Sequence, residues 1–202
     1  MKKFLVIILS LITTLLYAET NEAILEKIST HSRSLQSIES DFTQVNASIY
    51  LNVEKETPGK FYYKAEDKVC LKNDDKNFIL MNEGNFLVST DGNKVRADKK
   101  SSPMVSELGI LLKSCITGDY KTILQRRNTS LDITQDASYY ILNIKMGGSA
   151  KRYFSDVTLT YSKNDLSLYK LKLQEASGSY ITYTFSNQKF NAEIDLSVFN
   201  ID

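Results

Sequence analysis

The stretch that decides the fold runs from Ile38 to Asn73 and reads IESDFTQVNASIYLNVEKETPGKFYYKAEDKVCLKN. Apolar residues alternate with polar ones from Val45 to Leu51, a period of two that places one set of side chains on each face of a β-sheet. Pro58-Gly59 predicts a break, and the aromatic run 61–63 predicts a further strand. No residue of the stretch belongs to a catalytic motif, so it indicates the wall of a sheet.

Residues 1–18 have the composition of a secretory signal peptide. Lys2 and Lys3 give a positive start, residues 4–16 form a short apolar run, and Tyr17-Ala18 precedes a polar segment that begins at Glu19. We therefore predict cleavage after Ala18, a periplasmic protein, and a single domain over residues 19–202. The alternative is an uncleaved anchor helix, for which the apolar run is short.

Composition and charge exclude several classes of function. The chain has 202 residues, of which 42% are hydrophobic and 24% charged, so a buried core is expected and global disorder is not. Removal of Lys2 and Lys3 lowers Lys+Arg from 25 to 23 against 24 acidic residues, a net charge of −1. A nearly neutral chain is a poor candidate for nucleic acid or for wide contact with an anionic membrane.

Two amphipathic segments predict helices. In residues 21–37 the apolar positions recur at helical spacing, and His31 on their edge is interpreted as a packed, hydrogen-bonded residue. In residues 101–118, Pro103 suits a first turn and Gly118 an end. The apolar face of this second helix comprises Met104, Val105, Leu108, Leu111, Leu112 and Cys115. A short helical piece is predicted over residues 119–125.

The remaining segments predict an antiparallel meander. Short strands at 78–81, 86–88 and 94–98 are separated by the turn signals Glu83-Gly84-Asn85 and Asp91-Gly92-Asn93. From Leu131 onward, apolar and polar residues again alternate with a period of two in several segments. The last of these segments contains Ile181, Tyr183 and Phe185. A long meander curls because sheets twist, so we predict a curved sheet with the helices against its concave face.

No constellation of catalytic or metal-binding residues is found. The chain has one histidine, no CxxC and no HExxH, GxSxG or P-loop motif, so neither an enzyme nor a cofactor is predicted. Asp74-Asp75 and Asp165 are interpreted as solvated turn residues. Arg126-Arg127 is a small basic patch that suits a phosphate, although cations after helices are common.

Cys70 and Cys115 are the only cysteines of the chain. An exported protein tolerates a disulfide, and one between them would bridge a strand and a helix. The alternative is two buried free thiols, because cysteine is a good small core residue. Their spacing matches no metal motif.

Several segments, in order along the chain, resemble the LolA-type periplasmic lipoprotein carriers. They are Asp41-Phe42-Thr43-Gln44, then Gly59 to Lys64, and near the end Phe185-Ser186-Asn187 with Ile194-Asp195. The resemblance implies an α+β, mostly β fold: a curved antiparallel sheet that forms an incomplete β-barrel, with helices as a lid over its concave apolar face. The sequence departs from the family at the latch. In better-known members an arginine that latches the lid follows the lysine at the end of this strand, whereas here Lys64 is followed by Ala65-Glu66. Val69 stands where those members have an aromatic residue.

The resemblance also implies a function. It implies a monomeric periplasmic carrier that takes acylated lipoproteins, or another lipid, from an inner-membrane ABC transporter to an outer-membrane acceptor. An acyl chain costs about 0.8 kcal/mol per CH₂ exposed to water, so such cargo needs an apolar shelter. The alternative is an envelope sensor or interaction module on the same fold that binds lipidated or misfolded proteins. An enzyme acting on envelope lipids is a third possibility without a nucleophile and base to support it.

Candidate ligand-binding residues are the apolar positions of the middle strands and of the second helix. Periodicity alone cannot distinguish an open cavity from a filled core. The candidates are Val69, Leu71, Phe78, Leu80, Phe86, Val88, Met104, Val105, Leu108, Leu111 and Leu112.

Overall fold

The structure is a computed structural model that describes residues 19–50, 53–65, 68–82, 84–97 and 100–200. The predicted signal peptide, residues 1–18, lies outside the described residues. In that described part, no helix has the length and apolar character needed to cross a membrane. The elements in chain order are α1 (Asn21–Ser34), β1 (Ser37–Ser48), β2 (Val53–Lys64), β3 (Lys68–Lys72), β4 (Phe78–Asn82), β5 (Asn85–Thr90), β6 (Asn93–Arg96), α2 (Pro103–Thr117), α3 (Lys121–Leu124), β7 (Ser130–Gln135), β8 (Tyr139–Lys145), η1 (Ala150–Arg152), β9 (Phe154–Ser162), β10 (Leu168–Glu175), β11 (Tyr180–Phe190) and η2 (Leu196–Phe199).

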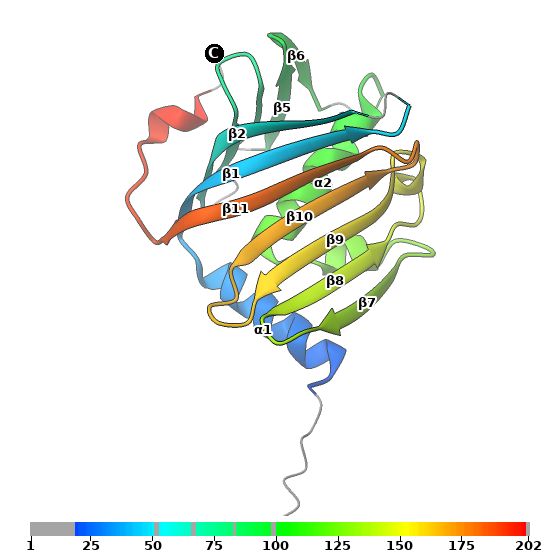
Figure 1. Ribbon diagram of the computed structural model, residues 1–202. Helices are drawn as coiled ribbons and strands as arrows, with labels where there is room; N and C mark the ends of the chain where they lie inside the picture. Colours follow the sequence, from blue (N-terminus) through cyan, green and yellow to red (C-terminus); the bar gives the residue numbers. More distant parts are fainter. Residues whose placement is uncertain (1–18, 51–52, 66–67, 83, 98–99, 201–202) are drawn as a thin grey trace, which may run out of the picture.

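The strands form one antiparallel sheet of eleven strands in the order β6-β5-β4-β3-β2-β1-β11-β10-β9-β8-β7. The sheet curves but is not closed, and β6 and β7 stand at its two ends. Figure 1 looks onto the convex face, with α2 behind the strands and α1 across one end. The predicted fold class is confirmed: a mostly β, α+β protein with an incomplete barrel whose concave face is covered by helices.

The concave face carries the main core. Directly opposed residues of an antiparallel pair share a face, and the register pairs Leu142 with Leu159, Leu159 with Leu171, and Leu171 with Tyr183. These four side chains are buried, as are most of their neighbours two positions along each strand; Tyr169 and Ile181 are partly buried. The alternation seen after Leu131 therefore predicted the inward face of β8 to β11.

The start of the sheet differs from the prediction in two places. The first helix ends at Ser34, because β1 already begins at Ser37. β1 then ends at Ser48, so Ile49 and Tyr50 lie in the turn to β2, with Tyr50 76% exposed. The alternation expected through Leu51 stops here because the hairpin must reverse direction; Leu51 itself lies outside the described residues.

Pro58 and Gly59 do not break a strand but lie inside β2. Pro58 stands opposite Thr43 of β1, and β3 pairs with β2 only from Lys60 onward. The N–H that proline lacks is therefore not missed in the hydrogen bonds between β2 and β3. Gly59 lies under the ring of Phe42, where a Cβ would come within 2.3 Å of the ring. Glycine is therefore needed here because an aromatic ring of the core packs on the backbone.

A polar cluster on the outer side of β1 supports this hairpin. The carboxylate of Asp41 accepts hydrogen bonds from the side-chain amide of Asn187, at 2.8 Å, and from the ammonium group of Lys60. The Asn187 amide first, and then Lys60, hold the pKa of the Asp41 carboxyl below its usual value. The side chain of Asp41 therefore links β1 to both neighbouring strands.

Helix α2 follows its prediction closely. It begins at Pro103 and ends before Gly118, which has a φ of 70°. Leu111 and Leu112 are buried, whereas Met104 in the first turn is 41% exposed and does not belong to the buried stripe. Gly109 lets the helix approach β5, because a Cβ there would lie 3.0 Å from the ring of Phe86.

The two cysteines lie in separate clusters. Cys115 of α2 is part of the main core, whereas Cys70 of β3 belongs to a small cluster with Leu80, Leu87 and Phe199 on the other side of the sheet. Both are free thiols, so the disulfide is not formed and the alternative of buried thiols holds. Burial raises the pKa of Cys70 to about 11 and that of Cys115 to about 12.

Candidate functional site

A groove opens at one end of the concave face, between the sheet and α2. It has a volume of about 330 Å³, at the low end of the roughly 300–1,000 Å³ common for small-molecule sites. Its apolar lining comprises Leu71, Phe78, Ile79, Val88, Leu108, Ile181 and Tyr183. Its polar lining comprises Gln44, Asn46, Lys55, Thr57, Asn73, Asp74, Asn77, Ser89, Thr90 and Asp91.

The polar part of the groove is explained by which side chains of β1 point to the concave face. Gln44 stands opposite Tyr183 on β11, and Asn46 opposite Ile181, so these polar side chains continue the inward face that Phe42 begins. The amide nitrogen of Gln44 donates to Asn46 Oδ1 at 3.0 Å. The concave face is thus apolar in its depth and polar at its open end. This was not predicted from the sequence, because the alternation that begins at Val45 suggested the opposite face from the one that carries Phe42.

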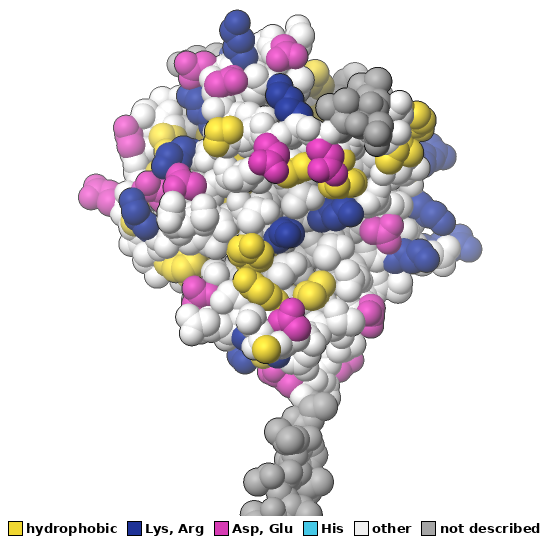
Figure 2. Space-filling model, in the orientation of Figure 1, with side chains coloured by type: hydrophobic (Ala, Val, Ile, Leu, Met, Phe, Trp, Pro, Cys, Tyr) yellow, Lys and Arg dark blue, Asp and Glu magenta, His cyan; other side chains and the backbone are white. Residues whose placement is uncertain are grey.

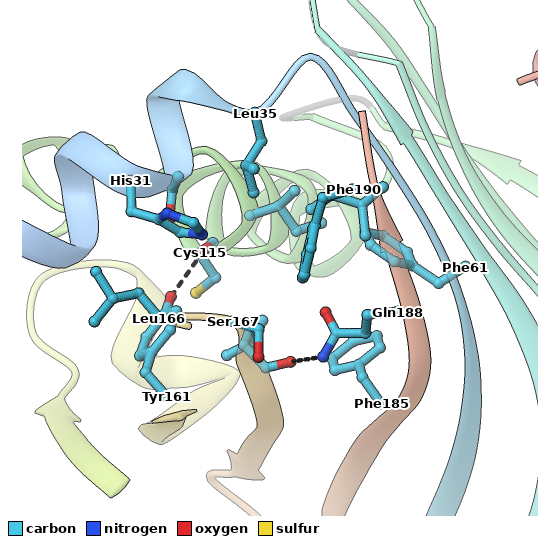
Figure 3. Close-up of a pocket in the computed structure, with 14 residues that line it drawn as sticks. His31, Leu35, Phe61, Cys115, Tyr161, Leu166, Ser167, Phe185, Gln188 and Phe190 are labelled. Carbon is cyan, nitrogen blue, oxygen red and sulfur yellow. Dashed lines mark hydrogen bonds between the residues drawn. The ribbon is translucent and has the colours of Figure 1, made fainter. Parts of the chain in front are cut away.

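A second, smaller space lies at the other end of the same core, between α1, α2 and β9 to β11. Figure 3 shows its lining, with Leu35 and Phe190 pointing into it and Cys115 from α2. Its volume is about 20 Å³, enough for one water molecule. The hydroxyl of Tyr161 donates to the carbonyl of Cys115 at 3.2 Å across its edge.

His31 lies at the border of this small space. Its ring packs edge-on against Phe190, with centroids 6.4 Å apart. Its Nε2 is buried and has no hydrogen-bond partner among the described residues, so the expected packing is present but the expected hydrogen bond is not.

An aromatic layer of Phe42, Phe61, Tyr183 and Phe185 occupies the core between the groove and the small space. The ring centroids of Phe42 and Tyr183 are 5.6 Å apart, and those of Phe61 and Phe185 are 5.3 Å apart. Helix α2 extends over the whole track, because Leu108 lines the groove and Cys115 lines the small space, about 10 Å further along the helix axis. In this structure the interior is therefore filled by aromatic side chains under one helix.

The predicted ligand-binding residues fall into three groups. Two of them, Phe78 and Leu80, pack with the small cluster beside Cys70 on the opposite side of the sheet, although Phe78 also lines the groove, and Met104 is exposed. The other eight belong to the main core or pack against it, and they are Val69, Leu71, Phe86, Val88, Val105, Leu108, Leu111 and Leu112. Both faces of β4 are covered, so its residues are apolar on both. The sequence therefore did not indicate which of them point to the concave face.

The remaining motif predictions concern turns and the latch position. Asp74 accepts hydrogen bonds from the backbone N–H groups of Lys76 and Asn77, both at 2.8 Å, as expected of a turn residue. Within the described residues no group of three or more His, Cys, Asp and Glu side chains is arranged to hold a metal ion. At the latch position, the N–H of Ala65 bonds the carbonyl of Gln36 at 2.8 Å; Glu66 lies outside the described residues.

Comparisons with known proteins give one family match and several similar solved structures. The family model described as outer membrane lipoprotein carrier protein LolA matches residues 33–202. Among curated proteins, none matches the chain in sequence. Similar solved structures include the LolA superfamily protein NE2245 from Nitrosomonas europaea, with 14% identity, a TM-score of 0.43 and coverage of 91% of this chain and 99% of that one.

Two further structures show comparable similarity. A putative outer membrane lipoprotein-sorting protein domain from Vibrio parahaemolyticus has 7% identity and a TM-score of 0.44, covering 88% of this chain and 94% of that one. A chain of the Pseudomonas aeruginosa MucA/MucB complex has 10% identity and a TM-score of 0.48, covering 88% of this chain and 59% of that one.

The fold defines the class of open, incomplete β-barrels whose apolar concave face is covered by helices, here α1 and α2. The chain belongs to the LolA family of outer membrane lipoprotein carrier proteins, because the family model matches most of its length.

Proposed function

We propose that this protein shields the acyl chains of lipoproteins, or of a related lipid, beneath α2 and carries them through the periplasm from the inner to the outer membrane. By resemblance, an inner-membrane ABC transporter would supply the cargo and an outer-membrane acceptor would take it. The protein acts by binding and release, without chemistry on its cargo. Membership of the carrier family supports the class of function.

The observation that carries the proposal is the continuous apolar track under α2. The groove provides an entrance with a polar rim, and the small space marks the far end of the track. Among the described residues, the aromatic layer lies between them, and we expect its rings to make room by side-chain rotation and slight shifts of α2. An acyl chain that replaces these contacts exchanges water for apolar surface at about 25 cal/mol per Å².

Mass spectrometry under native conditions tests the proposal on protein purified from a bacterial periplasm. A carrier retains acylated ligands, and a palmitoylated peptide displaces a bound apolar dye in a saturable manner. Purified protein that carries no lipid and does not bind the peptide would contradict the proposal. Co-purification of a polypeptide without an acyl group would instead favour the sensor or interaction module.

A further inference from the structure

A basic pocket lies beside the N-terminal half of α2, outside the apolar track. It has a volume of about 550 Å³ and is formed by the first turns of α2, the loop after α3 and the residues around η1. Arg126 and Arg127 come from the loop and Arg152 from the end of η1. The N–H of Gly147 bonds Thr129 Oγ1 at 3.1 Å and holds the two chain segments together.

The charges in this pocket are not balanced. Its lining contains three arginines and one glutamate, a net charge of +2. Glu107 is already bound, because its carboxylate contacts Nη1 of Arg126 at 2.6 Å and accepts a hydrogen bond from Ser149 at 3.1 Å. In the part of the chain that the structure describes, the side chains of Arg127 and Arg152 have no hydrogen bond or ion pair.

This pocket is more positive than the whole chain of 202 residues, whose formal net charge is +1. Figure 2 shows Lys and Arg side chains gathered at the right edge of the molecule, where Figure 1 draws η1 and the hairpin ends. Guanidinium groups form two parallel hydrogen bonds with phosphate, which makes Arg the residue best suited to that anion. The first turn of α2 faces the pocket through Pro103 and Ser106 and adds a favourable dipole.

We propose that Arg126, Arg127 and Arg152 bind the phosphate of a lipid head group at the N-terminal half of α2. The lipid source of this phosphate rests on the related lipid of the proposed function, because the acyl anchor of a lipoprotein carries no phosphate, whereas the phosphate chemistry rests on the pocket alone. Leu108, which lines the groove, follows Glu107 directly on α2. A phosphate that takes Arg126 from Glu107 releases a contact that holds this part of the helix, so head-group binding favours opening of the groove.

The test compares two ligands that differ by one phosphate, lauroyl lysophosphatidic acid and monolauroylglycerol, below their micelle concentrations. Charge-assisted hydrogen bonds predict that the wild-type protein binds the phosphorylated ligand roughly tenfold more tightly, and that added salt reduces this preference. Arg127→Gln combined with Arg152→Gln removes the preference. Arg33→Gln combined with Lys121→Gln removes the same charge elsewhere and keeps it.

Three outcomes overturn parts of the reasoning separately. Equal affinities for the two lauroyl ligands in the wild-type protein overturn the head-group site while leaving the carrier function standing. Absence of binding to either ligand contradicts the carrier function, and titration with inorganic phosphate then tests the pocket by itself. Inorganic phosphate that binds as tightly as lysophosphatidic acid overturns the lipid source of the phosphate.

The link to α2 has its own variant, Glu107→Gln. This change frees Arg126 without altering the size of the side chain, so the affinity for lysophosphatidic acid rises several-fold and an apolar dye enters the groove faster. An affinity that falls, or dye entry that slows, overturns the link between the phosphate site and the opening of the groove. Thermal melts of each variant verify that it is folded.

Discussion

Replacement of Phe42 by alanine tests whether the aromatic layer is what closes the interior. Phe42 is 2% exposed, packs on Gly59, and meets the rings of Tyr183 and Phe185. It stands on the strand position at which the inward face changes from apolar to polar. Its removal joins the groove to the space at the far end of the track.

The expected loss of stability follows from its burial. A buried Phe→Ala change costs about 3–5 kcal/mol, through lost transfer free energy and the cavity left behind. Domains of this size have free energies of unfolding of about 5–15 kcal/mol, so the variant remains folded under mild conditions. The new cavity is apolar and continuous with the groove, so an acyl chain fills it and recovers part of the loss.

Urea unfolding with and without a palmitoylated peptide measures both effects. Phe154→Ala is the matched control. Phe154 is 1% exposed in the same core but is not part of the aromatic layer, whereas Phe42 packs against Tyr183, which lines the groove, and Phe185, which lines the small space. A ligand at a hundred times its Kd stabilises a protein by about 2.7 kcal/mol, and Phe42→Ala shows a larger shift than the wild type or the control. Equal shifts in both variants refute the role of the aromatic layer.

Three other predictions follow from single sites. Leu108→Glu costs little stability, because the groove admits water, but it weakens binding of a palmitoylated peptide. Leu111→Glu is the control, because it buries its charge and costs about 3–5 kcal/mol. An equally large loss of stability for Leu108→Glu in thermal melts would contradict the open groove. Cys70 and Cys115 resist a thiol reagent at pH 7.5 in native protein and react after denaturation, since burial raises both pKa values; rapid labelling of either folded thiol would be inconsistent with this. The pKa of Asp41 is lowered in the folded protein, so its contribution to stability is present above pH 3.8, its ordinary pKa, and disappears as the pH falls through the folded pKa. Asp41→Asn therefore loses less stability than the wild type when the protein is titrated with acid. Identical acid curves for the two proteins would show that the hydrogen bonds of Asp41 do not contribute to stability.

Much of the fold was readable from the sequence because strand alternation and helix signals are local. The inward faces of β8 to β11 and the limits of α2 follow from such patterns. The phase of β1 and β4 does not, because β1 changes from apolar to polar along one face and β4 is apolar on both. Pro58-Gly59 misled for a third reason: its tolerance depends on which strand lies beside it and on the ring of Phe42.

The groove could be predicted only in part, since some of its apolar members were among the candidates, whereas Ile79, Ile181, Tyr183 and all its polar members were not. Leu71, Val88 and Leu108 follow from hydrophobic periodicity. Gln44 and Asn46 are ordinary polar residues whose place at the rim depends on the pairing of β1 with β11. The extent of filling also depends on tertiary packing, because the sequence does not show how far aromatic side chains from separate strands reach toward one another.

The two free ends of the sheet, β6 and β7, have a mechanical consequence. A closed barrel has a circumference fixed by its number of strands and their stagger, so its interior cannot widen without breaking hydrogen bonds. This sheet has no such constraint, because its strand order begins and ends without joining. It can flatten or coil by small changes of twist at every strand pair while each ladder stays intact. Under the proposed carrier function, cargo molecules of different width are accommodated at a cost spread over the whole sheet.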